Sequence, residues 1–291
     1  MGALWMLVAG LLFACMGVLI KLASAHFSSN EIVFYRSFFG LLLVAGMMIH
    51  QRTSHVTSHW RGHLWRSLSG AIAMMLFFYC LTTLPLATAI TLNYTSSLFL
   101  TVLTLVVFKD RFHLPVTISL GLGFCGVILL LHPTLEREQF ASGLMGLASG
   151  FLGAVALLNV RQLGQLGEPA MRVVFYLNLV ATLMSGVGMT QNVVHPVSLD
   201  SLPMLVAIGA SATLAQIALT RAYNTGHTQV VSSLSFSTIA FGSLFGLILW
   251  KETLTISGWL GIALIIASGV LSLKLSPKHE ERKHDYNRTI Q

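Results

Sequence analysis

Charged side chains are scarce in this sequence. Only 9% of its 291 residues are Asp, Glu, Lys or Arg, whereas soluble domains average about 25%. Hydrophobic residues make up 55% of the chain, and the mean hydropathy is +0.77. This composition excludes an ordinary soluble domain and predicts an integral membrane protein that is surrounded by the lipid bilayer.

Cysteine is also rare, and the three residues present, Cys15, Cys80 and Cys125, lie in three different apolar runs without CxxC spacing. We interpret them as small core residues and expect neither a disulfide nor a metal site. The eleven histidines lie mostly in loops and the C-terminal tail, without ligand spacing. We therefore expect no metal and no other cofactor.

The net charge of +7 is compatible with a protein that binds nucleic acid. However, the basic residues are scattered between apolar runs and form no patch interleaved with aromatic residues, so we expect no nucleic-acid partner. The stretch Gly121-Leu122-Gly123-Phe124-Cys125-Gly126 matches the dinucleotide fingerprint, but it lies inside an apolar run with no preceding strand. Helix packing explains these glycines better.

Long apolar runs are what the sequence has in abundance. They are continuous, whereas membrane β-strands alternate apolar and polar residues over about ten positions, so we interpret the runs as helices of about 20 residues each. The predicted spans are residues 3–24, 31–49, 67–83, 87–108, 115–131, 142–161, 170–190, 201–223, 228–250 and 256–274. The predicted fold class is all-α integral membrane, with ten transmembrane helices.

An internal repeat divides these helices into two halves. Residues 81–131 return in altered form at 223–273, and an offset of 142 maps Pro85 onto His227 and Ser96 onto Thr238 without a gap. A long match at one offset indicates duplication. We therefore expect a first five-helix repeat at 1–132, an inter-repeat loop at 133–141, a second repeat at 142–275 and a tail at 276–291.

Five helices per half is an odd number, so the second half enters the membrane from the opposite side. The halves then form an inverted repeat, an architecture in which substrate sites lie near the midplane between the repeats. With a cytoplasmic N-terminus, 13 of the 17 Lys and Arg residues face the cytoplasm, three face the other side and Arg36 lies within a span. The positive-inside rule therefore predicts that both termini are cytoplasmic.

Particular motifs give the chain a family resemblance. They are Phe34-Tyr35-Arg36-Ser37-Phe38-Phe39, the run 85–95 that leads to Lys109-Asp110, and a second-half counterpart that closes at Trp250-Lys251-Glu252 and 258–269. With ten spans in two halves, the sequence resembles the drug/metabolite transporter superfamily, and specifically the bacterial EamA-type transporters. The resemblance implies transport of small organic solutes across the inner membrane through a central cavity.

Two departures from the family pattern indicate an asymmetric site. The first charged turn is Lys109-Asp110-Arg111, where the family more often carries a glutamate. The seventh predicted helix has Phe175-Tyr176-Leu177-Asn178 in place of a counterpart to Arg36.

Arg36 is the sharpest candidate for function, because an ionisable group inside a span is costly. It lies about 7.5 Å into its predicted helix, and its guanidinium could hold a carboxylate or phosphate at two points. The alternative is that its long stem reaches the outer surface or pairs with a loop carbonyl.

Two further predicted helices, 87–108 and 228–250, carry more hydroxyl and amide groups than lipid contact allows, which favours a shared polar cavity. Such groups also bond back to helix carbonyls or join helices, and aromatic residues commonly serve packing. The candidate substrate-binding residues are Tyr35, Arg36, Phe38, Tyr79, Asn93, Thr95, Ser96, Asn178, Gln216, Ser235 and Thr238.

The sequence therefore predicts a secondary transporter that exports a small polar organic metabolite, such as an amino acid or a related compound. Uptake or exchange of a nucleoside-like metabolite such as S-adenosylmethionine is an alternative, and a membrane scaffold or enzyme is another. We expect no catalytic residues. The carboxylates of Glu31, Asp110, Glu168, Asp200 and Glu252 all fall at predicted helix ends or in loops, which leaves no buried acid for ion coupling and favours facilitated diffusion or exchange.

Overall fold

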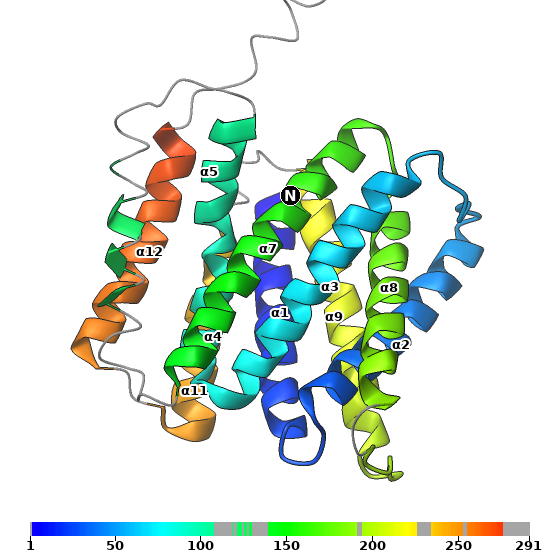
Figure 1. The fold of residues 1–291 in the computed structure, drawn as a ribbon, viewed down its shortest axis with the longest axis horizontal. Coiled ribbons are helices and arrows are strands. Elements are labelled where there is room, and N and C mark those ends of the chain that lie inside the picture. The colour runs from blue at the N-terminus through cyan, green and yellow to red at the C-terminus, as the bar shows by residue number, and fades with distance from the viewer. Residues whose placement is uncertain are drawn as a thin grey trace, which may run out of the picture.

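A computed structural model describes residues 2–107, 118, 121–123, 125, 126, 128, 129, 139–190, 194–225, 234–252 and 255–275. All the regular structure in these residues is helical (Figure 1). The elements are α1 (Gly2–Ala23), α2 (Ser29–His50), α3 (Trp60–Thr83), α4 (Leu86–Tyr94), α5 (Ser96–Val107), α7 (Phe140–Gln165), α8 (Ala170–Thr190), α9 (Leu202–Thr225), α11 (Ser237–Trp250) and α12 (Ile256–Leu275).

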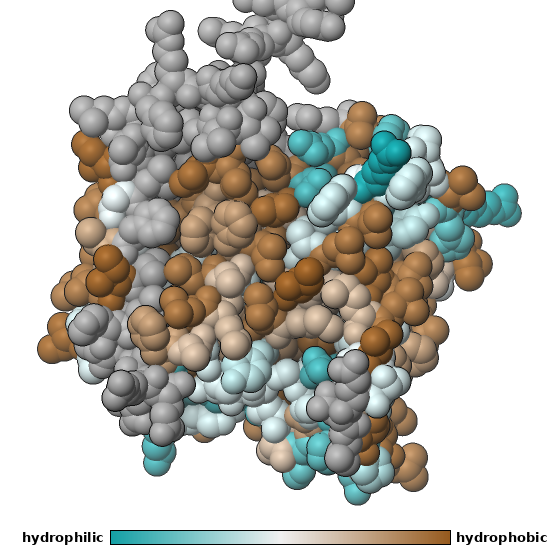
Figure 2. All heavy atoms as spheres, in the orientation of Figure 1, coloured by the Kyte–Doolittle hydropathy of each residue, from teal (hydrophilic) through white to brown (hydrophobic). Residues whose placement is uncertain are grey.

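The described helices are those of a multi-pass membrane protein. Six of them, α1, α2, α3, α7, α8 and α9, contain stretches long and apolar enough to cross a bilayer, and α11 and α12 contain shorter apolar stretches. In Figure 2 hydrophobic side chains cover the middle of the visible face, while hydrophilic ones gather towards the ends of the helices. Most of the predicted 115–131 span, the start of the 228–250 span and the 276–291 tail lie outside the described residues.

Helix α3 corrects the sequence prediction at its first end. It begins at Trp60 rather than at Ser67, so His63 and Arg66 belong to the helix and are buried. Both lie at helical spacing with Ser67 on the face that packs against α7 and α8. Because this face meets protein and not lipid, its polar side chains are tolerated, although they lower the hydropathy on which the prediction relied.

The predicted helix 87–108 is interrupted at Thr95, which separates α4 from α5. Thr95 Oγ1 donates a hydrogen bond to the carbonyl of Leu92, 2.6 Å away, and the backbone keeps right-handed helical angles. A similar turn at Phe236 precedes α11, within one position of the residue that the 142-residue offset pairs with Thr95. The interruption at Thr95 is therefore a local turn and not a change of direction.

The helices pack mainly across the two halves of the chain. α1 lies along α9, α3 along α7, and α2 along α8. α5 and α12 lie together at the edge of the molecule opposite to α2 (Figure 1).

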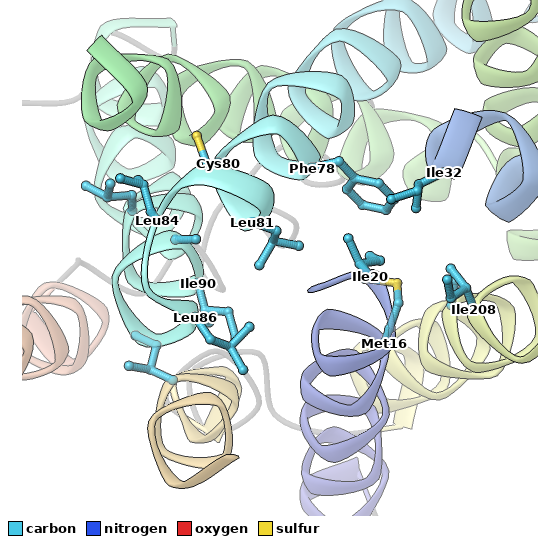
Figure 3. Packing of buried hydrophobic residues seen from close by; sticks show 14 of the residues in the cluster. Met16, Ile20, Ile32, Phe78, Cys80, Leu81, Leu84, Leu86, Ile90 and Ile208 are labelled. Carbon is cyan, nitrogen blue, oxygen red and sulfur yellow. The ribbon is translucent and has the colours of Figure 1, made fainter. Parts of the chain in front are cut away.

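The main apolar core lies at the end of the bundle where α1 and α3 finish and α2 and α4 begin. Figure 3 shows side chains from these helices and from α9 converging there, with Ile20, Ile32, Phe78, Leu81 and Ile208 among them. At the opposite end of α1 a smaller cluster joins it to α9, with Met6, Ala9, Ala218 and Ala222. Apolar packing is thus concentrated at one end of the helices.

Candidate functional site

Arg36 is held inside the bundle. Its side chain is 4% exposed, and Nη1 donates a hydrogen bond to Asn178 Oδ1 on α8, 3.0 Å away. Arg36 therefore does not reach the surface, and within the described part of the chain its guanidinium bonds to a side chain of α8 and not to a loop carbonyl. Asn178 lies 142 positions after Arg36, the same offset that relates residues 81–131 to 223–273 in the sequence. The sequence identified both residues, but it did not predict that they bond to each other.

A second arginine, Arg66 on α3, lies in the same region and was missed by the sequence analysis. It is 7% exposed, and a Cβ added at Gly70 would collide with its Nη1 and lie 3.1 Å from Leu177 Cδ1. The guanidinium therefore lies over Gly70, beside the residue that precedes Asn178. The spacing of His63, Arg66, Ser67 and Gly70 on one helical face was the signal that could have found it.

Another set of polar contacts surrounds the interruption between α4 and α5. Asn93 Nδ2 donates to Ser149 Oγ on α7, 2.9 Å away, and the hydroxyl of Tyr94 donates to Thr238 Oγ1 on α11, 2.8 Å away. Thr95 is buried, and its hydroxyl bonds back within the helix. Asn93, Thr95 and Thr238 thus lie where α4, α7 and α11 meet.

The remaining candidates are more widely spread. Ser235 is buried just before α11, Ser96 begins α5, and Gln216 is partly buried on α9. Tyr35 is also partly buried, whereas Phe38 is 38% exposed and Tyr79 is 40% exposed. The structure therefore does not bring Phe38 and Tyr79 to the buried polar groups.

One end of the bundle is held by an ion pair between Lys21 on α1 and Glu252, which follows α11. Glu252 Oε2 also accepts from the backbone N–H of Leu86 at 2.9 Å, and Lys21 Nζ lies 5.1 Å from the ring centroid of Trp250. These contacts join α1, α4 and α11 beside the main apolar core. The sequence predicted that Glu252 lies at a helix end, but it did not predict that Glu252 links helices.

Glu31 is another carboxylate whose burial the sequence did not predict. It lies in the first turn of α2, where Oε2 accepts from the N–H of Ser28 at 2.7 Å and completes a capping box. It is 1% exposed and also accepts from the backbone N–H of His195, 2.7 Å away. The expectation that Glu31 stands at a helix end is confirmed, and its burial there is explained by the capping box and the bond from His195.

At the other end of the bundle, Glu168 joins the loop before α8 to the loop before α3. Its carboxylate accepts from Thr57 at 2.5 Å, from His59 at 3.0 Å and from Arg172 at 2.6 Å, and His63 Nε2 lies 3.2 Å away. Burial by itself would raise the pKa of Glu168. The contacts with these four side chains outweigh that effect and lower the pKa to about 2.

Comparison with known proteins identifies the family. The sequence model of the EamA-like transporter family matches residues 1–132. A pseudopaline exporter of Pseudomonas aeruginosa is 30% identical over 277 residues, which cover 93% of this chain and 95% of the exporter. This chain belongs to the EamA-like transporter family. It is thus a transporter rather than an enzyme, as the sequence motifs indicated.

Other relatives of this EamA-like chain are also named as transporters. An uncharacterized transporter of Helicobacter pylori is 28% identical, with 93% of both chains covered. A riboflavin transporter of Vibrio cholerae is 26% identical, with 98% of this chain and 96% of the relative covered. One of these relatives is thus named for a vitamin that it transports, and the other is named only as a transporter.

A solved crystal structure shares the fold. It superposes with a TM-score of 0.69 and covers 94% of this chain and 97% of its own, at 15% sequence identity. At that identity the likeness concerns the fold alone.

Proposed function

We propose that this chain is a secondary transporter built from two inverted five-helix repeats, which exports a small polar organic metabolite, such as an amino acid or a related compound, by alternating access. The hydrogen bond between Arg36 and Asn178 is the observation that carries this proposal. Two residues at equivalent positions of two repeats contact each other only close to the axis that relates the repeats. Substrate sites of such transporters lie between the repeats, near the midplane.

The helix bounds and contacts support the same two-fold relation. Adding 142 to the bounds of α3, Trp60–Thr83, gives 202–225, which are the bounds of α9. The contact of α1 with α9 has its counterpart in α7 with α3, and that of α2 with α9 in α8 with α3. A duplicated unit related by a two-fold axis accounts for all of these pairs, with repeats at 1–132 and 142–275 separated by the loop 133–141.

The orientation that we propose places both termini and the 276–291 tail in the cytoplasm, with the protein in the bacterial inner membrane. Arg61 and Arg66 both belong to α3, but only Arg66 is buried; without it, twelve Lys and Arg residues remain on the proposed cytoplasmic side against three on the other. This bias still satisfies the positive-inside rule.

In this orientation the Lys21–Glu252 ion pair and the main apolar core close the outer end of the pathway. The opposite end of α1 is joined to α9 by only a small cluster, so we propose that it opens first towards the cytoplasm. Transport then requires the two repeats to rock, which separates Lys21 from Glu252 and closes the inner end.

We propose that transport proceeds by facilitated diffusion or exchange and is driven by gradients of the substrates themselves. Glu31, Glu168 and Glu252 are shielded from solvent, but they lie at the ends of the bundle and each accepts hydrogen bonds or pairs with a cation there. Among the described residues, none of these carboxylates pairs with Arg36 or Arg66. The central region therefore offers no acidic relay in the part of the chain that the structure describes.

Metabolite profiling tests the proposal first. Cells that carry the chain and cells that lack it are compared, and any metabolite that differs is measured for transport in proteoliposomes containing the purified protein. We expect Arg36→Ala and Asn93→Ala to reduce that transport without loss of membrane insertion. Native-level transport in both variants would show that these two residues do not form the substrate site.

Uptake or exchange of a nucleoside-like metabolite such as S-adenosylmethionine is the second candidate. The relative named as a riboflavin transporter favours it, because riboflavin also carries a ring system. The direction of flux in proteoliposomes under opposite substrate gradients distinguishes uptake or exchange from export.

A further inference from the structure

Two buried arginines approach each other from opposite ends of the bundle. Arg36 lies about 10 Å from the start of α2, and Arg66 about 9 Å from the start of α3, which runs back alongside α2. Helical side chains usually lean towards the N-terminus. Arg66 instead lies over Gly70, one turn in the C-terminal direction, so its guanidinium extends towards the level of Arg36.

Both guanidinium groups converge on the same part of α8. Arg36 bonds to Asn178, and Arg66 lies beside Leu177. Leu177 and Asn178 are adjacent on α8, so the two cationic side chains approach neighbouring residues of this helix.

Neither cation has its charge balanced within the described part of the chain. The ion pairs found there involve Lys21, three histidines and Arg172, but neither Arg36 nor Arg66. The Nε atoms of both arginines also have no hydrogen-bond partner among the described residues. Buried charges without a counter-charge are costly, so this arrangement favours an anion that completes it.

We propose that Arg36 and Arg66 together bind an oxyanion of the transported metabolite, with Asn178 holding Arg36 in place. The planar guanidinium group binds carboxylate and phosphate oxygens at two points, so the shared chemistry is a carboxylate or phosphate group on a small solute. This deepens and rests on the proposed transport function. It restricts the substrate to metabolites that carry at least one negative oxygen group.

The test uses the purified full-length chain in detergent and three probes: sodium succinate, sodium phosphate and sodium chloride at matched ionic strength. Thermal unfolding is followed as each probe is titrated. We expect succinate or phosphate to raise the Tm above the chloride control, and the more effective of the two identifies the carboxylate or the phosphate as the group bound. In Arg66→Gln the apparent Kd for that anion rises about tenfold or more, because charge-assisted hydrogen bonds are lost.

Arg61→Gln is the matched control, since Arg61 lies on the same helix but is exposed and stands beside the ring of Trp60. It should leave the anion response unchanged. Arg66→Lys serves if Arg66→Gln does not fold, because it keeps the charge but loses the two-point geometry, and it should also weaken the response.

Two results overturn the oxyanion site: an equal Tm response to all three salts in the native chain, or an undiminished response in both Arg66 variants. Transport in proteoliposomes distinguishes this failure from failure of the proposed function. If both Arg66 variants transport a metabolite with native affinity, the transporter proposal is supported and the oxyanion site is contradicted. If the native chain transports no metabolite but still binds an anion through Arg66, the anion-binding site is supported and the transporter proposal is contradicted.

Discussion

Asn178 bonds to Arg36 and follows Leu177, the residue beside Arg66, so a substitution at Asn178 tests both arginines. Asn178→Asp places a carboxylate of nearly the same shape beside Arg36, which donates to its oxygen. We expect the variant to be more stable than the native chain, because the buried cations gain a counter-charge. We also expect the Tm to stop responding to succinate and phosphate, since the site is occupied from within.

Asn178→Leu serves as the control for that substitution, because it removes the hydrogen bond without adding charge. It should unfold at a lower temperature than the native chain. A carboxylate at this position that lowers the Tm as much as leucine would contradict the interpretation of Arg36 and Arg66.

Glu168 is a second residue whose environment has a measurable consequence. Its pKa falls to about 2 in the folded chain from an ordinary value of 4.5. The native state therefore gains stability from this carboxylate at pH values above about 4.5, and that gain is lost as the pH falls towards 2. We expect Glu168→Gln to lower the Tm at pH 6 and to lose its difference from the native chain progressively below pH 4.5.

Thermal unfolding of the purified native chain and Glu168→Gln across this pH range checks the expectation. The reversible part of the range is used, and salt is held constant. A difference between the two chains that stays constant from pH 6 to pH 3 would show that the ionised carboxylate is not what joins the two loops.

At the scale of the helices, close packing across the interruption at Thr95 can be tested through Gly150 on α7. A Cβ at this position would overlap Thr95 Oγ1 and lie 2.8 Å from the carbonyl oxygen of Leu92. We expect Gly150→Ala to cost about 1–3 kcal/mol of stability, because the backbone oxygen cannot move freely.

Gly46→Ala on α2 is the matched control for Gly150→Ala. Nothing lies within 4 Å of a Cβ there, and alanine favours a helix over glycine by about 1 kcal/mol. Its stability should be equal to or above that of the native chain. Unfolding of both variants in the same detergent gives the comparison, and equal stability of the two would contradict close contact between α7 and α4.

The sequence predicted helices well where apolar residues dominate and poorly where a buried face is polar. The predicted span 170–190 agrees with α8, whose apolar run has clear ends. The predicted start of the third span was wrong because Arg66 and His63 face other helices, and hydropathy cannot distinguish that from exposure to water. The turn at Thr95 was missed because a hydroxyl that bonds to a backbone carbonyl has no signature of its own in composition.

The pairings between distant residues of the candidate site could not be predicted from the sequence. The 142-residue offset already placed Arg36 and Asn178 at equivalent positions, but only the packing of α2 against α8 makes them partners. The burial of Glu31 likewise depends on His195, which is 164 residues away. Such pairings require the tertiary arrangement of the helices.

At the scale of the whole molecule, alternating access predicts that the end held by Lys21 and Glu252 opens. Leu81 is fully buried in the main apolar core at that end. In a chain whose three native cysteines are replaced by alanine, we expect the thiol of Leu81→Cys to react slowly with a membrane-impermeant maleimide. Glu252→Gln should speed this labelling, because the ion pair and its hydrogen bonds no longer hold the helices together.

The exchanged pair Lys21→Glu with Glu252→Lys is the control for the role of charge. It should restore slow labelling in part, since an ion pair can form again, although the bond from the Leu86 N–H to the carboxylate is lost. Slow labelling in the Glu252→Gln variant would contradict opening at this end.

We propose that a metabolite crosses the membrane between two repeats whose axis passes close to Arg36 and Asn178. Its most direct measurement is transport of the metabolite found by profiling, in proteoliposomes, by the native chain, by Arg36→Asn and by Arg36→Asn combined with Asn178→Arg. We expect the single variant to lose at least about tenfold in transport and the exchanged pair to recover a measurable part of it. Native-level transport by Arg36→Asn would show that the metabolite does not pass beside this residue.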